Sequence, residues 1–171
     1  MKKEKLYFAA FKGKSFISRA IRKLTRGEYS HIAFYDKEYN RLIEQWPHNG
    51  NMLQAWMDYS DFSKHSPETE YEVWSLKMSI TDSQYCKNYY RTEAEKKTAY
   101  DFSGIAAFLF KGNDSKDKTF CSEASIIPIA RILGWDRLKP EIVDPSYFIN
   151  LIQAAGGQLE GSFVTQSKKE D

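Results

Sequence analysis

Apolar positions recur along the chain with two periods, and the shorter period predicts strands. Residues 5–11, 30–35, 41–46, 71–78 and 158–165 have strand-like patterns bounded by polar or glycine-containing segments. The polar turn around Lys37 and Glu38 predicts that the second and third of these strands form a hairpin. Residues 49–70 are mostly polar with scattered aromatic residues, so we expect a long, partly ordered loop there.

The longer period predicts helices at residues 14–26, 81–97, 102–110, 120–133 and 145–155. Ser15 is a candidate N-cap for the first helix, and Thr81 with Gln84 resembles a capping box for the second. Asp144-Pro145 combines an N-cap with proline at the first helical position. The charged residues 113–118 predict a mobile loop before the helix that starts near residue 120.

Strand and helix patterns in this order predict an α+β fold, with a small antiparallel sheet packed against the helix at residues 120–133. The length of 171 residues suits one domain with its own core. We assign residues 1–166 to this domain and residues 167–171 to a disordered charged tail.

The helix predicted at residues 14–26 has an apolar stripe and a basic side. The stripe is formed by Phe16, Ile17, Ala20, Ile21 and Leu24, and the basic residues Arg19, Arg22, Lys23 and Arg26 lie mostly opposite. Simple solvation of the basic side is the preferred interpretation. Attraction to an acidic or membrane surface remains the alternative.

Composition and charge narrow the classes of function. The net charge is +2, whereas a dedicated nucleic-acid binder is usually far more basic, so we expect no nucleic-acid partner. The apolar runs are too short for a membrane span, and lysines interrupt the only early apolar stretch, which favours a cytoplasmic protein. The two cysteines form no zinc-type pair, and no residue cluster has metal-ligand spacing. We therefore expect free thiols, no metal and no cofactor.

Cys121 is the strongest candidate for chemistry, because it opens a predicted helix. Unpaired backbone N–H groups and the positive end of the helix dipole favour the thiolate, which is the nucleophilic form. The same N–H groups can hold an oxyanion. A small buried apolar residue is the alternative interpretation of Cys121.

His31 lies in a strand pattern and has a candidate partner across the hairpin. If Lys37-Glu38 is a two-residue turn, His31 pairs with Glu44, and their side chains share a face. Glu44 would then orient one nitrogen of the ring while the other nitrogen faces a nucleophile. A register slipped by one residue would instead make Gln45 the orienting residue.

Two further residues are candidates for substrate or oxyanion binding. Tyr100 either lines the site or packs as an aromatic residue, and Ser122 follows Cys121 in the first turn of its helix. No Gly-x-Ser-x-Gly elbow marks a serine hydrolase. His48 and His65 lie in a polar stretch and are interpreted as surface histidines, and Cys86 receives no role.

Several short motifs, taken in order, resemble the permuted NlpC/P60 hydrolases, in particular their YiiX-like branch. Residues 29–33 (YSHIA) resemble the histidine strand of that family, and residues 120–123 (FCSE) resemble its nucleophile segment. Residues 100–104 (YDFSG) and 144–148 (DPSYF) resemble two further family segments. The resemblance covers residues 6–148. The chain departs from the family in lacking the Gly-Asp start and the export signal of many cell-wall members, so peptidoglycan is not the expected substrate.

The resemblance implies a circularly permuted papain-like fold with Cys121 as nucleophile, His31 as base and Glu44 as the third residue. It implies a cysteine hydrolase of the peptidase or amidase class that acts on a small peptide or amide. A lipid acyl esterase, thioesterase or acyltransferase with the same triad remains an alternative. A non-catalytic binding module on the same fold is the second alternative.

Overall fold

The sheet is built around a central strand, β1 (Lys3–Lys12), that pairs with neighbours from distant parts of the sequence. The computed structural model describes residues 2–48, 51–97, 99–100 and 121–166. Within them, an antiparallel sheet has the strand order β6-β4-β3-β2-β1-β5-β7. The other strands are β2 (His31–Asp36), β3 (Arg41–His48), β4 (Asn51–Ser60), β5 (Glu70–Ser79), β6 (Ala99–Tyr100) and β7 (Gln158–Val164).

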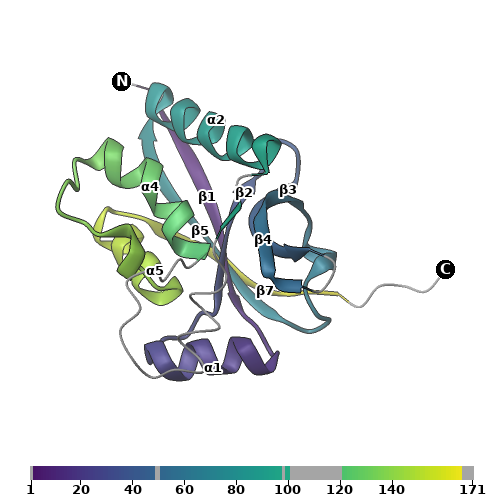
Figure 1. Ribbon diagram of the computed structural model, residues 1–171. Coiled ribbons are helices and arrows are strands. Elements are labelled where there is room, and N and C mark those ends of the chain that lie inside the picture. Colours follow the sequence, from purple (N-terminus) through teal and green to yellow (C-terminus); the bar gives the residue numbers. More distant parts are fainter. Residues whose placement is uncertain (1, 49–50, 98, 101–120, 167–171) are drawn as a thin grey trace.

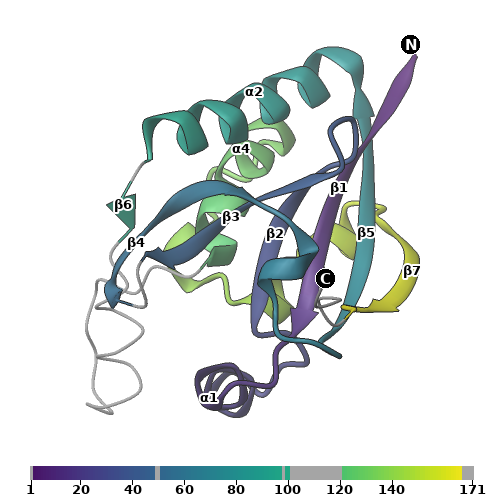
Figure 2. The same cartoon turned by 90° about the vertical axis from the view of Figure 1, so that its right-hand side faces the viewer.

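Helices α2 (Ile80–Lys96), α4 (Cys121–Leu133) and α5 (Pro145–Ala154) pack on one face of this sheet (Figure 1). The fold is therefore α+β, with the helix that begins at Cys121 against the sheet, as the sequence predicts. Helix α1 (Phe16–Thr25) lies apart from the other helices, beyond the end of β1 where the chain turns back toward β2 (Figures 1 and 2). Short 3-10 turns occur at η1 (Phe62–Lys64) and η2 (Pro140–Ile142).

Most predicted elements are confirmed, but the long loop predicted at residues 49–70 is wrong. β4 occupies most of that stretch and pairs with β3 from Leu42–Ser60 to His48–Asn51. β4 lies between β3 and the two-residue strand β6. Asp58 and Ser60 are half-exposed, although both belong to this strand. Pairing with β3 thus provides backbone hydrogen bonds for this segment. Its polar side chains interrupt the alternation of apolar and polar residues that usually predicts a strand.

The turn between β2 and β3 is longer than predicted. Asp36 pairs with Arg41, and Phe34 pairs with Ile43, so residues 37–40 form a four-residue connection with Asn40 at a φ of 48°. The predicted two-residue turn is wrong, and the register is shifted by two residues. A shift of two leaves every side chain on its predicted face, because side chains alternate with a period of two.

Helix ends follow side-chain caps. Ser15 caps α1 by accepting from the N–H of Ser18, and Asp144 caps α5 by accepting from two N–H groups, both as predicted. The capping box predicted at Thr81 is wrong, because Ser79 caps α2 and exchanges hydrogen bonds with Asp82. The predicted helix 102–110, loop 113–118 and tail 167–171 lie outside the described residues.

The main core lies between the sheet and the three helices. β1 contributes Leu6 and Phe8, and Ile126 of α4 and Phe148 of α5 pack against them. A smaller apolar cluster on the opposite face of the sheet contains Ala9, Phe11, Ala33 and Leu42. Residues of β2 therefore alternate between the two clusters, and His31, two residues before Ala33, lies on the side of the smaller cluster.

Candidate active site

His31 is the first residue of β2 and pairs with Phe11 near the end of β1. The adjacent Ser30 is buried and donates its hydroxyl to the Phe11 carbonyl, while it accepts the N–H of Gly13. A Cβ on Gly13 would lie 2.3 Å from Oγ of Ser18, so only glycine allows this close approach. These contacts fix the start of β2 and leave the ring of His31 partly exposed.

Glu44 of β3 holds one edge of the His31 ring. Nε2 of His31 lies 2.7 Å from Oε2 of Glu44, whose side chain is fully buried. The observed register, continued by one pair, sets Glu44 opposite Ala33, so His31 is its diagonal neighbour on the same face. The predicted contact is therefore present, although the predicted pairing of the two residues is not. Gln45, the alternative orienting residue, makes no such contact.

A second histidine, His65, contacts the same carboxylate. Nε2 of His65 lies 3.2 Å from Oε2 of Glu44, and its ring stacks on Phe11 with centroids 3.6 Å apart. The side chain is buried, so its assignment as a surface histidine is wrong. No local signal marked His65, because its partners Phe11 and Glu44 come from strands far away in the sequence. The side chain of His48 lies outside the described residues.

Cys121 begins α4 beside the start of β2. Its Sγ accepts a hydrogen bond from the N–H of Ile32 at 3.3 Å and also forms a hydrogen bond with the side chain of His31. Because Nε2 of His31 faces Glu44, Nδ1 is the ring nitrogen left for the sulfur. The described pairs between β2 and β3 end at Phe34–Ile43. The N–H of Ile32 lies past this end of the pairing, and it donates to Sγ of Cys121. The fold thus joins Cys121, His31 and Glu44 in that order.

The charges of His31 and Glu44 stabilise each other. Burial lowers the pKa of His31, but its contacts with Cys121 and Glu44 outweigh burial and raise that pKa to about 10. Burial raises the pKa of Glu44, but hydrogen bonds from His31 and His65 outweigh it and hold that pKa well below its usual range. The structure therefore favours an imidazolium beside the sulfur at neutral pH.

The other two predicted site residues, Ser122 and Tyr100, have different surroundings. Ser122 is buried in the first turn of α4, and its hydroxyl donates to the carbonyl of Val143. Tyr100 belongs to β6 and pairs with Ala55; its side chain lies outside the described residues. The role predicted for each in oxyanion binding stays a prediction.

Gln45 is a polar residue with unused hydrogen-bonding capacity at the site. It is 3% exposed, and its Nε2 has no hydrogen-bond partner among the described residues. It lines a pocket of about 320 Å³ together with His31 and His65. Other walls of this pocket come from Phe11 and from α1, whereas Cys121 is not a lining residue. A larger pocket of about 570 Å³ contains none of these residues.

Neither a metal centre nor a membrane-spanning helix appears in the part of the chain that the structure describes. Comparison of the chain with protein-family models, curated proteins and solved structures found no match.

The pKa of His31 can be tested by NMR titration of its ring nitrogens. Its folded-state pKa of about 10 exceeds the reference value of 6.5. Protonation of His31 therefore stabilises the fold fully below pH 6.5, and this contribution is lost as pH rises through about 10. Glu44→Gln should lower the titration midpoint, because it removes one of the contacts that raise it. Glu38→Gln, which changes an exposed carboxylate bound to Arg91, should not. An unchanged midpoint in Glu44→Gln would contradict the assignment.

Thiol labelling tests the environment of Cys121. Iodoacetamide near neutral pH should modify Cys121 well before Cys86, whose burial, together with Asp82, raises its pKa to about 12. His31→Ala should slow labelling of Cys121 by roughly tenfold, since it removes the neighbouring imidazole. Peptide mass spectrometry separates the two sites, and denaturant should equalise their rates. Equal rates in the folded protein would count against a reactive Cys121.

Proposed function

We propose that the protein is a cysteine-dependent hydrolase that cleaves an amide bond, as a small peptidase or amidase does. The observation that supports this proposal is the continuous contact from Sγ of Cys121 through His31 to the buried carboxylate of Glu44. A nucleophile, a base and an orienting group in hydrogen-bonding sequence are the parts of a catalytic triad. Both cysteines are free thiols, which fits the reducing environment of the proposed cytoplasmic location.

The proposed fold family is the circularly permuted papain-like group, specifically the YiiX-like branch of NlpC/P60 hydrolases. Its support is the order of the parts: the histidine strand comes first, and the helix with the nucleophile comes later and packs against an antiparallel sheet. The resemblance of residues 29–33 and 120–123 to that family points the same way.

In the first half of the proposed reaction, the His31 imidazolium already holds the proton that came from the thiol, and Sγ of Cys121 attacks the substrate carbonyl. The new C–S bond creates a tetrahedral intermediate with a negative oxygen. As the intermediate collapses, the C–N bond breaks and the His31 imidazolium gives its proton to the leaving amine. Glu44 stabilises the imidazolium throughout, which matches the raised pKa of His31.

Two donors are suited to the negative oxygen. One is the backbone N–H of Ser122 in the first turn of α4, where the helix dipole is positive. The other is Nε2 of Gln45, which is buried without a hydrogen-bond partner among the described residues; Gln45 lines the same pocket as His31. A donor that is already desolvated and unpaired stabilises a developing charge without first giving up another hydrogen bond.

In the second half, water attacks the thioester carbonyl while His31 accepts one of its protons. Collapse of the second intermediate breaks the C–S bond, releases the carboxylic acid and leaves Sγ of Cys121 beside the His31 imidazolium, as at the start. His65 takes no proton in this scheme. It is a positioning residue, because it donates to the same Glu44 oxygen that orients His31.

An acyl ester or thioester of a lipid is a second candidate substrate, with the same triad. The walls of the pocket beside His31 favour it, because Phe11, Ile17 and Ile21 present apolar side chains there. Acyl chains gain affinity from such surfaces at about 0.8 kcal/mol for each buried methylene group. A substrate panel therefore has to include both peptidyl and acyl esters.

The triad is tested by turnover on that panel. Cys121→Ala should abolish turnover, and Glu44→Gln should reduce kcat by roughly tenfold to a thousandfold because the His31 cation loses its partner. Adding Glu44→Gln to Cys121→Ala should cost little more, since the three residues act as a unit. Circular dichroism checks that each variant keeps its fold. Full turnover by Glu44→Gln on a substrate that Cys121→Ala does not process would exclude Glu44 from the triad.

The role of Gln45 is tested by Gln45→Met, which keeps the size of the side chain and removes its N–H donors. We expect kcat to fall by roughly a hundredfold, as it does when one oxyanion donor is lost. Labelling of Cys121 by iodoacetamide should stay unchanged, because the donor acts on the substrate oxygen and not on the thiol. The matched control is Gln153→Met on the exposed side of α5. Wild-type kcat in Gln45→Met would rule out this donor.

A further inference from the structure

Helix α1 has large apolar side chains that the described part of the chain leaves exposed. Phe16 is 75% exposed and Leu24 is 48% exposed, whereas Ile21 is the buried residue of this helix. Residues 16, 20 and 24 lie one above the other on a helix, so Phe16, Ala20 and Leu24 form one row. The apolar stripe read from the sequence is therefore divided: Ile21 is packed inward, Phe16 and Leu24 are exposed, and Ala20 between them is half-buried.

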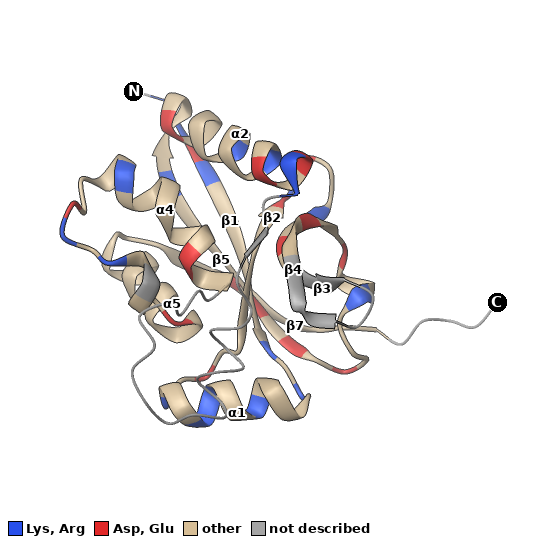
Figure 3. Ribbon diagram, viewed as in Figure 1, with Lys and Arg blue, Asp and Glu red and all other residues tan. Residues whose placement is uncertain are grey.

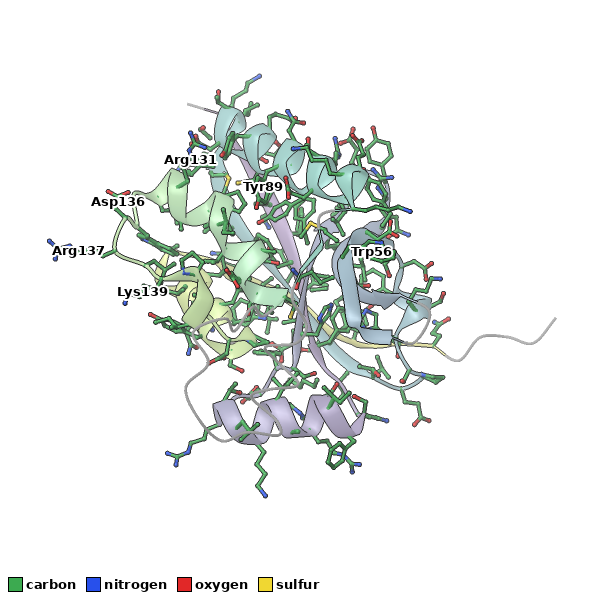
Figure 4. All side chains as sticks on the ribbon, viewed as in Figure 1. Trp56, Tyr89, Arg131, Asp136, Arg137 and Lys139 are labelled. Atoms are coloured by element: carbon green, nitrogen blue, oxygen red, sulfur yellow. The ribbon has the colours of Figure 1, made fainter. Side chains whose placement is uncertain are left out.

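A row of cations runs beside the apolar row. Arg19, Lys23 and Arg26 are exposed and form no ion pair with any described residue. Residues 12–27 contain no Asp or Glu, and α1 shows basic residues but no acidic ones (Figure 3). The long side chains of α1 reach away from the sheet (Figure 4). The outer surface of α1, defined by these six residues, thus combines apolar and basic side chains.

We propose that the outer surface of α1 docks onto an anionic lipid bilayer. Large apolar residues next to unpaired cations are typical of helices that lie in the membrane interface, where the apolar row enters the acyl boundary and the cations meet anionic headgroups. Simple solvation accounts for the cations but leaves Phe16 and Leu24 in water. A symmetric dimer through the same surface would place three cations against three cations, with no acidic residue between residues 12 and 27 to pair them.

The inner side of α1 connects this surface to the candidate active site. Ile17, Ser18 and Ile21 line the pocket that also contains His31 and Gln45. A protein docked through α1 would therefore hold that pocket beside the headgroup layer, one helix width from the lipid. The docking proposal itself rests on the exposed residues of α1 and does not require that Cys121 be catalytic.

The test is co-sedimentation of the full chain with vesicles of phosphatidylcholine, with and without phosphatidylglycerol. We expect binding to the anionic vesicles, weak binding to the neutral ones, and release by added salt. Arg19→Glu with Lys23→Glu should weaken binding by more than about tenfold, since each cation near an anionic leaflet contributes roughly fivefold. Phe16→Ser should weaken binding to anionic vesicles without changing its dependence on salt.

Matched controls separate docking from net charge and from catalysis. Arg137→Glu with Lys139→Glu makes the same change of charge at exposed positions beyond α4, away from α1 (Figure 4), and should leave binding unchanged. Cys121→Ala should bind as the wild type does, whatever the fate of the hydrolase proposal. Absence of wild-type binding to anionic vesicles, or equal losses in the α1 and control pairs, would overturn the proposal. So would a Phe16-dependent dimer that does not bind vesicles.

Discussion

The buried carboxylate of Glu44 is the constraint on which the rest of the site depends. Its side chain is fully buried in β3, and an isolated carboxylate there would be strongly unfavourable. His31 and His65 make this burial possible, because both donate to the same oxygen. The support is mutual, since Glu44, together with Cys121, raises the pKa of His31. One carboxylate thereby connects β2, β3 and the segment that follows η1, and it fixes which edge of the His31 ring remains for a nucleophile.

The place of Cys121 follows from how β2 is held between its neighbours. β1 pairs with β2 as far as His31, whereas the described pairing with β3 ends at Phe34. The backbone of β2 beyond that point is available to another partner, and Sγ of Cys121 accepts the N–H of Ile32. Ile126 and Ile129 pack α4 against the sheet, and this packing positions Cys121, the first residue of α4, relative to the imidazole of His31. A local gap in strand pairing and a distant helix thus produce the contact that the proposed chemistry uses.

The proposed chemistry and the proposed docking surface meet at α1. The inner side of this helix belongs to the pocket beside His31, and its outer side carries Phe16 and the unpaired cations. Gly13 and Ser30 hold the chain tightly where β1 passes into α1, so the position of the helix relative to β2 is well defined. A lipid ester would reach such a pocket from the bilayer, and a soluble amide would reach it from water. Vesicle binding and the substrate panel therefore answer separate questions about one part of the molecule.

The sequence by itself determined the features that depend on local periodicity and caps. These include the strand at His31, the helix that begins at Cys121, the Ser15 and Asp144 caps, and the shared face of His31 and Glu44. The prediction of a shared face was correct despite the wrong turn length, because a shift of two residues keeps each side chain on the same face of the strand.

Only the tertiary structure decided the features that depend on distant partners. β4 is a strand because β3 pairs with its polar sequence. His65 is buried because its ring stacks on Phe11 and hydrogen-bonds to Glu44. Phe16 and Leu24 are exposed because α1 packs inward through Ile21, and a helical pattern shows which residues share a face but not what covers that face.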